Sequence, residues 1–190
     1  MKIMIDPGHG GTDPGAESKV RYMGRGYEEK AIALAIAREL DHILGLAGFD
    51  VRMTRYADIY LGLTQRCTIA NRWPADLFVS IHLNADPDDD GPGTSEARGH
   101  EVWIYPAAAR SRKLAECIAA QMRTMFPDEP FRGVKEGNLA VCRLTQMPAV
   151  LVEVGFIDNS ETARQLCDPA ARRQLAQSIA NGIADYCGAV

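Results

Sequence analysis

The stretch Leu77-Phe78-Val79-Ser80-Ile81-His82-Leu83 is an apolar run that predicts a β-strand, with a histidine close to its end. Similar short runs, rich in Val, Ile and Phe, recur on both sides of it. They predict further strands over Lys2–Asp6, Asp50–Arg55, His100–Tyr105, Leu139–Arg143 and Ala149–Gly155. The chain is therefore expected to contribute six strands to its fold.

Helical patterns lie between these runs. In the segment from Glu28 to Leu46, apolar residues such as Ile32, Ile36 and Leu40 recur at helical spacing, with charged residues opposite. Further helices are expected over Thr64–Trp73 and Arg110–Met125, and over a last segment capped by Asp168, begun by Pro169 and followed by Gly188. Strands and helices that alternate predict an α/β fold with a mostly parallel sheet. In such a sheet, functional residues gather at the carboxyl ends of the strands.

Length and composition narrow the class of protein. The chain has 190 residues, of which 46% are hydrophobic and 24% charged, so it can bury a core and is not expected to be disordered. No internal repeat or linker divides it, and we expect residues 1–190 to form a single domain. The formal net charge is -4, without a basic stripe, which argues against nucleic acid as a partner.

Cysteine usage and hydropathy give expectations about the compartment. Five cysteines without a CxxC pair are typical of reduced thiols, not of a disulfide framework or a cysteine zinc site. No stretch approaches the roughly 18 apolar residues of a membrane-spanning helix. The chain opens at Met1 without a basic, apolar leader, so we expect no signal peptide unless one has been trimmed.

Three strand ends contain polar residues that burial alone does not explain. His82 ends one apolar strand, Glu153 interrupts another, and His9 stands in the glycine turn that follows Lys2–Asp6. Each alone is compatible with a structural hydrogen bond or salt bridge. Because all three should meet at one edge of the sheet, they favour a functional site. A buried carboxylate such as Glu153 also needs a cationic or metal partner unless it is solvated.

Two imidazoles and a carboxylate are the ligand set of a catalytic zinc ion, which leaves one position for water. A further carboxylate would accept the proton of that water. Glu28 or Glu29, at the start of the first predicted helix, is a candidate for this set, although an acidic residue there can simply complement the helix dipole. The residues by themselves leave open which carboxylate has which role.

Competing motifs fail on specific positions. His100-Glu101 is not an HExxH motif, because position 104 is Ile, and no GxSxG serine motif occurs. The glycines after the first strand fit neither a P-loop nor a dinucleotide fingerprint. The segment Asp86–Gly91 matches the first half of a calcium loop, but position 97 is Ala where the closing Glu belongs. We interpret this acidic segment as a solvated surface loop.

A set of motifs recurs in order along nearly the whole chain, from residue 2 to about 187. They are Ile5–Gly11, Glu29-Lys30 with Leu34–Ala37, Arg66 with Ala70-Asn71, Ser80–Ala85, Gly99–Glu101, Met147–Ile157 and Asn159. In these motifs the chain resembles the catalytic domain of the zinc-dependent N-acetylmuramoyl-L-alanine amidases, the family of AmiC-type division amidases and many phage endolysins. The resemblance implies a three-layer sandwich around a six-stranded, mostly parallel sheet.

The resemblance also implies roles for individual residues. His9, Glu29 and His82 are expected to bind one Zn²⁺, with Glu28 as the less favoured alternative to Glu29, and Glu153 is expected to be the catalytic carboxylate. Ser80, Asn84 and Glu101 could orient the ligands by hydrogen bonds. The alternative for these three is that they only make hydrogen bonds of strand ends and turns.

The implied reaction is hydrolysis, by zinc-activated water, of the peptidoglycan amide bond between N-acetylmuramic acid and the L-alanine of the stem peptide. Two alternatives are a zinc peptidase that cuts within the stem peptide and a non-catalytic cell-wall-binding module. A digest of purified cell walls separates the three.

Departures from the family pattern give the expectations about partners. No blocking helical insertion is apparent between His82 and Glu153, and no wall-binding repeat follows Cys187. We therefore expect a monomer that needs no activator protein. Without a leader, such an enzyme would reach the wall by phage-type release from the cytoplasm, or by secretion if a leader has been removed.

Overall fold

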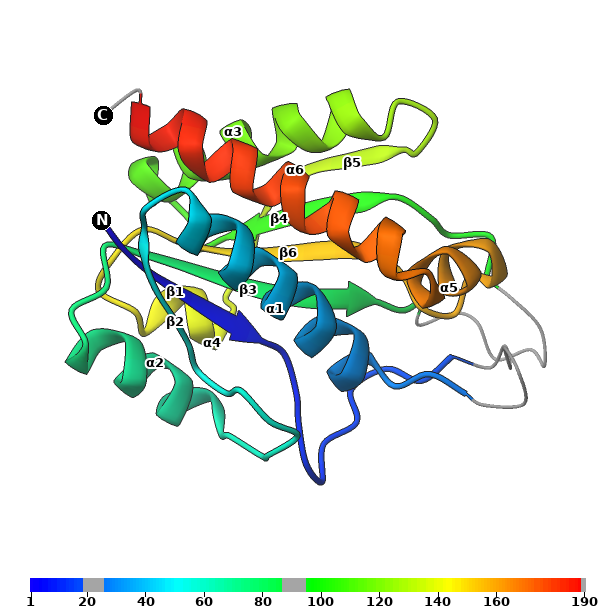
Figure 1. Cartoon of the computed structure of the whole chain (residues 1–190), viewed down its shortest axis with the longest axis horizontal. Coiled ribbons are helices and arrows are strands. Elements are labelled where there is room, and N and C mark those ends of the chain that lie inside the picture. The colour runs from blue at the N-terminus through cyan, green and yellow to red at the C-terminus, as the bar shows by residue number, and fades with distance from the viewer. Residues whose placement is uncertain (19–25, 87–94, 189–190) are drawn as a thin grey trace.

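The computed structural model describes residues 1–18, 26–86 and 95–188. Within these ranges the strands form one six-stranded sheet in the order β2-β1-β3-β6-β4-β5, shown in Figure 1. The strands are β1 (Lys2–Pro7), β2 (Asp50–Met53), β3 (Leu77–Asn84), β4 (His100–Ile104), β5 (Phe131–Glu136) and β6 (Ala149–Phe156). Residues 87–91 of the acidic segment Asp86–Gly91, interpreted as a solvated loop, lie outside the described residues.

Strand direction decides which residues meet at one edge of the sheet. β2, β1, β3 and β6 are parallel, whereas β4 is antiparallel to β6 and parallel to β5. The beginning of β4 therefore lies beside the end of β6. In register, His82 of β3 pairs with Glu153 of β6, and Glu153 pairs with Glu101 of β4. The predicted mostly parallel sheet is confirmed, and its antiparallel β4 adds Glu101 to the row of polar residues.

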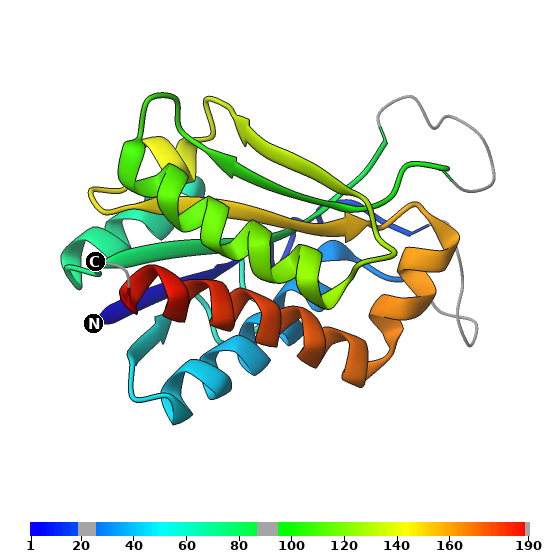
Figure 2. The same ribbon diagram turned by 90° about the horizontal axis from the view of Figure 1, so that it is seen from above.

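Helices cover both faces of the sheet, so the predicted three-layer arrangement is confirmed (Figure 2). The helices are α1 (Glu29–Leu46), α2 (Leu63–Arg72), α3 (Ala109–Met125), α4 (Ala140–Arg143), α5 (Ser160–Cys167) and α6 (Pro169–Gly188). α1, α3 and α6 pack together over one face and bury the larger apolar core. α2 and α4 pack over the other face and bury a smaller one.

The alternation of side chains along β6 explains why Glu153 is not in the larger core. Val150, Val152 and Val154 belong to the core under α1, α3 and α6, whereas Leu151 belongs to the smaller core under α2 and α4. Since successive side chains of a strand point to opposite faces, Glu153 points to the same face as Leu151. The carboxylate therefore lies on the face that α2 and α4 cover only in part.

Two sequence predictions need correction. The strand predicted over Leu139–Arg143 is wrong: residues 140–143 form the short helix α4, which buries Val141 and Cys142 in the smaller core. A short apolar run fits a buried strand or a buried helical turn equally well, so its periodicity could not decide. The sixth strand is instead β5, an edge strand whose Arg132, Gly133 and Lys135 gave no apolar signal.

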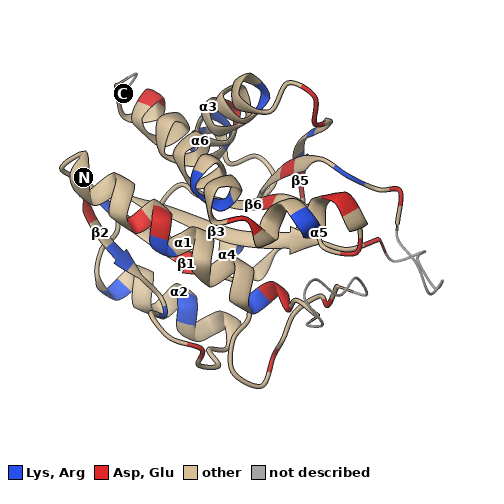
Figure 3. Ribbon diagram, turned by 45° about the vertical axis from the view of Figure 1, so that its right-hand side comes forward, with Lys and Arg blue, Asp and Glu red and all other residues tan. Residues whose placement is uncertain are grey.

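Other predicted boundaries are confirmed closely. α6 starts at Pro169, and the Asp168 side chain accepts a hydrogen bond from the Ala170 amide at 2.9 Å, as an N-cap should. All five cysteines are unpaired, as their spacing indicated. No helix of the described residues combines the length and hydrophobicity needed to cross a bilayer. Figure 3 shows acidic and basic residues scattered over the described ribbon.

A buried ion pair fixes the turn that follows β1. The Asp6 side chain is fully buried and accepts a hydrogen bond from Arg66 of α2 at 2.9 Å. The same guanidinium donates to the carbonyl oxygens of Pro7 and His9, each at 2.6 Å. These carbonyl groups lie at the end of β1 and in the turn after it, where donors must come from outside the strand ladder. Arg66 thus ties the backbone on both sides of Gly8 to α2.

Arg55 and two hydroxyl groups complete this network. Arg55, 1% exposed, donates to the carbonyl oxygens of Pro7 at 3.1 Å and of Gly8 at 2.7 Å. The hydroxyl groups of Thr54 and Ser80 donate to the Asp6 carboxylate at 2.6 and 2.8 Å. Each oxygen of the buried carboxylate therefore has a donor, as burial of a charged group requires.

Removal of the Arg66 guanidinium should destabilise the fold. Arg66→Leu leaves the Asp6 carboxylate buried without its cation, and we expect the free energy of unfolding to fall by about 3–5 kcal/mol. Urea denaturation followed by circular dichroism measures the change. Arg72→Leu, at an exposed position on the same helix, is the control and should change stability by less than about 0.5 kcal/mol. Equal denaturation midpoints for the two variants would contradict the role given to the ion pair.

Candidate metal centre

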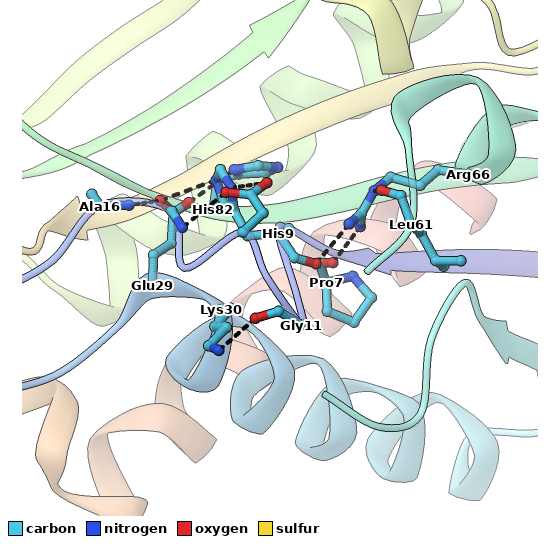
Figure 4. Close-up of polar contacts among 12 residues, drawn as sticks. Pro7, His9, Gly11, Ala16, Glu29, Lys30, Leu61, Arg66 and His82 are labelled. Atoms are coloured by element: carbon cyan, nitrogen blue, oxygen red, sulfur yellow. Dashed lines mark hydrogen bonds and ion pairs between the residues drawn. The ribbon is translucent and has the colours of Figure 1, made fainter. Parts of the chain in front are cut away.

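Three side chains converge from three elements at the carboxyl edge of the sheet. His9 lies in the turn after β1, Glu29 is the first residue of α1, and His82 lies near the end of β3. Glu29 stands between the two rings: its Oε2 is 3.1 Å from His9 Nε2 and its Oε1 is 2.9 Å from His82 Nδ1, as Figure 4 shows. One ligand atom from each residue lies within 4.8 Å of the others.

The glycines of the first loop allow this convergence. A Cβ atom on Gly8 would lie 2.5 Å from the ring of His82. A Cβ atom on Gly15 would lie 2.6 Å from both Glu29 Oε2 and the His9 ring, and Gly15 also has a φ of 70°. Both positions require a residue without a side chain because ligand groups occupy that space. The loop thus presses its backbone against the three side chains.

The structure places Glu29, and not Glu28, between the histidines. Glu29 is 3% exposed, and its carboxylate also accepts hydrogen bonds from the backbone amides of Ala16 at 2.9 Å and Leu83 at 3.0 Å. The side chain of Glu28 is 46% exposed and pairs with Lys30 at 3.2 Å. Lys30 in turn donates to the carbonyl oxygen of Gly11, which links α1 to the loop (Figure 4).

Neighbouring charges control the protonation of these groups. Burial opposes ionisation of Glu29, but hydrogen bonds from His82 and His9 outweigh it and lower the pKa of this carboxyl. Burial also disfavours the His9 imidazolium, yet Glu29 and Asp13 raise its pKa. Asp13 Oδ2 lies 2.9 Å from His9 Nδ1, so it can hold a proton on Nδ1 and leave Nε2 as the nitrogen that faces Glu29.

Glu153 approaches the centre from β6 as a carboxylate without a partner. Its Oε2 is buried and has no hydrogen-bond partner among the described residues. Burial is the main cause that raises the pKa of Glu153 to about 7, and the nearby charge of Glu29 adds to it. A buried carboxylate that nothing neutralises is costly, so this group is not explained by the fold alone.

A cavity of about 330 Å³ connects these groups to the surface. His9, His82 and Glu153 line it on the sheet side. The loop before α2, with Tyr60 and Leu61, the first residue of α2 and the start of α4 form the other wall. The side chains of His9 and His82 are 25% and 18% exposed, so a small molecule can reach them. The site is a cleft between the sheet edge and the α2–α4 layer.

The three residues expected to orient the ligands, Ser80, Asn84 and Glu101, form their hydrogen bonds with other residues. The Ser80 hydroxyl donates to Asp6 and so reaches the His9 turn only through the Asp6–Arg66 pair. Asn84 donates to Glu101 at 3.3 Å. Glu101 accepts hydrogen bonds from groups on β4 and β5, and no hydrogen bond between it and the three converging side chains is found in the described chain.

Two residues near the centre were not predicted as part of it. Asp13 contacts His9, and Arg55 holds the carbonyl groups of the turn. A carboxylate four residues after a candidate ligand is only a weak indication that it contacts that ligand. An arginine after a strand gives no indication in the sequence that it holds a neighbouring turn. Of the two other histidines, His100 is buried, does not line the cavity, and contacts the carbonyl oxygen of Val154 at 2.9 Å. His42 is exposed on α1.

The residues present fit a divalent metal ion. Two imidazole nitrogens and one carboxylate oxygen within 4.8 Å of one another form a donor set suited to zinc. The carboxylate is ionised because its pKa is lowered, as a metal ligand requires. Asp13 behind His9 is the carboxylate partner that metal-bound histidines commonly have. Glu153, whose Oε2 has no hydrogen-bond partner among the described residues, lines the same cavity as His9 and His82.

Comparisons with solved structures identify proteins of the same fold. A solved N-acetylmuramoyl-L-alanine amidase from Clostridium difficile 630 superposes with a TM-score of 0.89 at 34% identity, over 98% of this chain and 96% of that one. The CwlD amidase from Clostridioides difficile, solved in complex with the GerS lipoprotein, superposes with a TM-score of 0.90 at 29% identity, over 100% and 99% of the two chains.

Sequence comparisons give the same family. The sporulation-specific N-acetylmuramoyl-L-alanine amidase of Bacillus subtilis (strain 168) is 38% identical over 185 residues, which cover 96% of this chain and 67% of the relative. The CwlM amidase of Bacillus licheniformis is 38% identical over 97% of this chain and 68% of its own length. A family model for N-acetylmuramoyl-L-alanine amidases matches residues 3–185. By fold, cleft and sequence, this chain belongs to the N-acetylmuramoyl-L-alanine amidase family.

Proposed function

We propose that this chain is a zinc-dependent peptidoglycan amidase that hydrolyses the bond between N-acetylmuramic acid and the L-alanine of the stem peptide. One observation carries the proposal. His9 and His82, which converge on Glu29, line the same cavity as Glu153, and no hydrogen bond of the buried Glu153 Oε2 is found among the described residues. Family membership gives the bond that is cleaved.

The three converging residues would hold one Zn²⁺, with Glu29 bridging the histidines as the buried, ionised ligand. When bound, the ion would polarise a water molecule and the scissile carbonyl group. Asp13 would keep the proton on His9 Nδ1 and so direct Nε2 to the ion. Gly8 and Gly15 would leave free the space that the ligand side chains occupy.

Glu153 would act as general base and then as general acid. Glu153 lines the cavity, and no hydrogen bond of its Oε2 is found among the described residues, so its carboxylate would be available to accept the proton of the attacking water. The carboxyl group would then donate that proton to the departing amine of L-alanine. The larger core beneath β6 fixes the strand on one face, so the carboxylate has a defined position at the cavity wall.

We further propose that residues 1–190 act as one catalytic domain, as a monomer and without an activator. α3, which lies between β3 and β6 in the sequence, packs on the opposite face of the sheet from the cleft. α4 lines the cavity through Ala140 and Val141. The relative CwlD was solved with a lipoprotein partner, so the requirement for a partner needs a direct test.

Digestion of purified sacculi tests the reaction. The purified chain alone should release intact stem peptides with a free L-alanine amine, measured by mass spectrometry and amine labelling. A zinc chelator should abolish release, and added Zn²⁺ should restore it. Cuts within the peptide would indicate a peptidase, and binding without release a wall-binding module. A requirement for a partner protein would refute the activator-free proposal.

Glu153→Gln should separate catalysis from metal binding. The amide keeps the shape of the side chain but cannot accept the proton, so we expect kcat to fall by about 10²–10⁴-fold. Zinc content, measured by atomic emission, should equal that of the wild type. Retained turnover would overturn the role of Glu153, and lost zinc would place it among the ligands instead.

His9→Ala and His82→Ala should lower the zinc content of the purified protein, since each removes one of three protein ligands. His42→Ala is the matched control, because His42 is exposed on α1 outside the cleft. Dialysis against a competing chelator followed by metal analysis gives the order of affinities. An unchanged stoichiometry in the two cleft variants would count against the ligand assignment.

A further inference from the structure

A second polar cluster lies on the cleft face of the sheet, beside Glu153. Glu101 of β4 is in register with Glu153 and its side chain is 2% exposed. Its Oε1 accepts hydrogen bonds from Arg132 Nε at 2.8 Å and from Lys135 Nζ at 2.7 Å. Its Oε2 accepts from the Trp103 indole at 2.9 Å. We call Glu101, Arg132 and Lys135 the β4–β5 cation cluster.

A bulge in β5 places both cations on the cleft face. Phe131 and Val134 both pack against the larger core, although they are three residues apart. Strict alternation would put residues three apart on opposite faces. The β4–β5 register shifts here, and Gly133 has a φ of 111°, which only glycine adopts readily. Arg132 and Lys135 consequently both point away from that core, toward Glu101.

The cluster retains positive charge and unused donors. Two cations face one carboxylate, so one net positive charge remains, and the other hydrogen-bond partners of Glu101 are neutral. Arg132 contacts Glu101 through Nε, and no hydrogen bond of its terminal nitrogens is found within the described ranges. The side chains of Arg132 and Lys135 are 41% and 34% exposed. The terminal nitrogens of an arginine form a fork that matches a carboxylate.

Ring contacts keep the two cations in place. Arg132 lies over the ring of Phe156 at 4.9 Å, and Lys135 lies over the ring of Trp103 at 5.3 Å. Each cation is thus held by a carboxylate on one side and an aromatic ring on the other. Burial opposes ionisation of Glu101, but the hydrogen bonds from Lys135 and Arg132 outweigh it and lower its pKa. The arrangement is ordered before any ligand arrives.

We propose that the β4–β5 cation cluster binds a carboxylate of the stem peptide and thereby sets the direction in which the substrate crosses the cleft. This inference rests on the proposed amidase function. Arg132 and Lys135 contact the carboxylate, and Glu101 is a positioning residue that orients them. The peptide side of the scissile bond then lies over β4 and β5.

The spacing of the sheet gives the position of that carboxylate along the peptide. β5 lies two strands from β6, so its backbone is about 10 Å from that of Glu153, given a strand spacing of about 4.8 Å. An extended peptide advances about 3.3 Å per residue. A carboxyl group on the second or third residue of the stem peptide therefore falls within reach of Arg132 and Lys135.

The test compares two soluble N-acetylmuramoyl tripeptides that begin with L-alanine. In one, the carboxyl groups of the second and third residues are free, and in the other they are amidated. With the zinc-loaded wild type we expect kcat/KM to be about tenfold higher for the free acid, mainly through KM, since hydrogen bonds to charged groups are the stronger ones. Arg132→Gln and Lys135→Gln should each reduce this preference, and the double variant should abolish it.

Arg173→Gln is the matched control, because Arg173 pairs with Glu39 on the α1–α6 face, away from the cleft. It should keep the wild-type preference. Thermal melting and zinc content check that each variant is folded and loaded. Glu101→Gln should weaken the preference less than the double variant does, since both cations remain.

The outcomes separate this inference from the amidase function. If the wild type cleaves neither tripeptide, while chelator-sensitive release from sacculi is also absent, the proposed function fails. If the wild type cleaves both tripeptides equally well, the carboxylate site is refuted and the function stands. An equal loss on both substrates in the folded double variant would likewise refute recognition of the carboxylate.

Discussion

The buried pair of Asp6 and Arg66 is the interaction on which the site depends. A strand that ends in a turn leaves carbonyl groups without partners, and here the guanidinium of Arg66 takes two of them while it neutralises Asp6. Arg55 takes the carbonyl group between. The turn that presents His9 is therefore held by side chains from α2 and from the end of β2. Without these side chains, a glycine-rich loop could adopt many backbone conformations.

Glu29 then links His9, which lies in that turn, to His82 of the sheet. Its carboxylate contacts both histidines and two backbone amides, so one side chain fixes the start of α1 against the ends of β1 and β3. Burial of such a charge is tolerable because each of its two oxygens faces one backbone amide and one imidazole nitrogen. Glu153 differs because its oxygen is left unpartnered, and this difference separates a ligand from a base in our proposal.

Much of this could be predicted from the sequence, and the failures have physical causes. The strands that position His9, His82 and Glu153, namely β1, β3 and β6, are apolar and central, so their pattern is strong. β5 is an edge strand with a bulge, and Arg132 and Lys135 on its open face erased the alternation. α4 is only four residues long, and a run of that length has no measurable period. The choice of Glu29 over Glu28 came from the resemblance. The sequence pattern alone does not show at which residue the helix starts, and that start decides in which direction each of the two adjacent side chains points.

The sequence by itself determined the α/β class, the mostly parallel sheet and the edge at which the polar residues gather, because hydrophobic periodicity is local. Tertiary structure alone decided the rest. It reversed β4, so that Glu101 meets Glu153, and it put Asp13 behind His9 and Arg66 on the carbonyl groups of a distant turn. These are contacts between residues far apart in the chain or within irregular loops. Their geometry follows from packing of the layers, which no local pattern records.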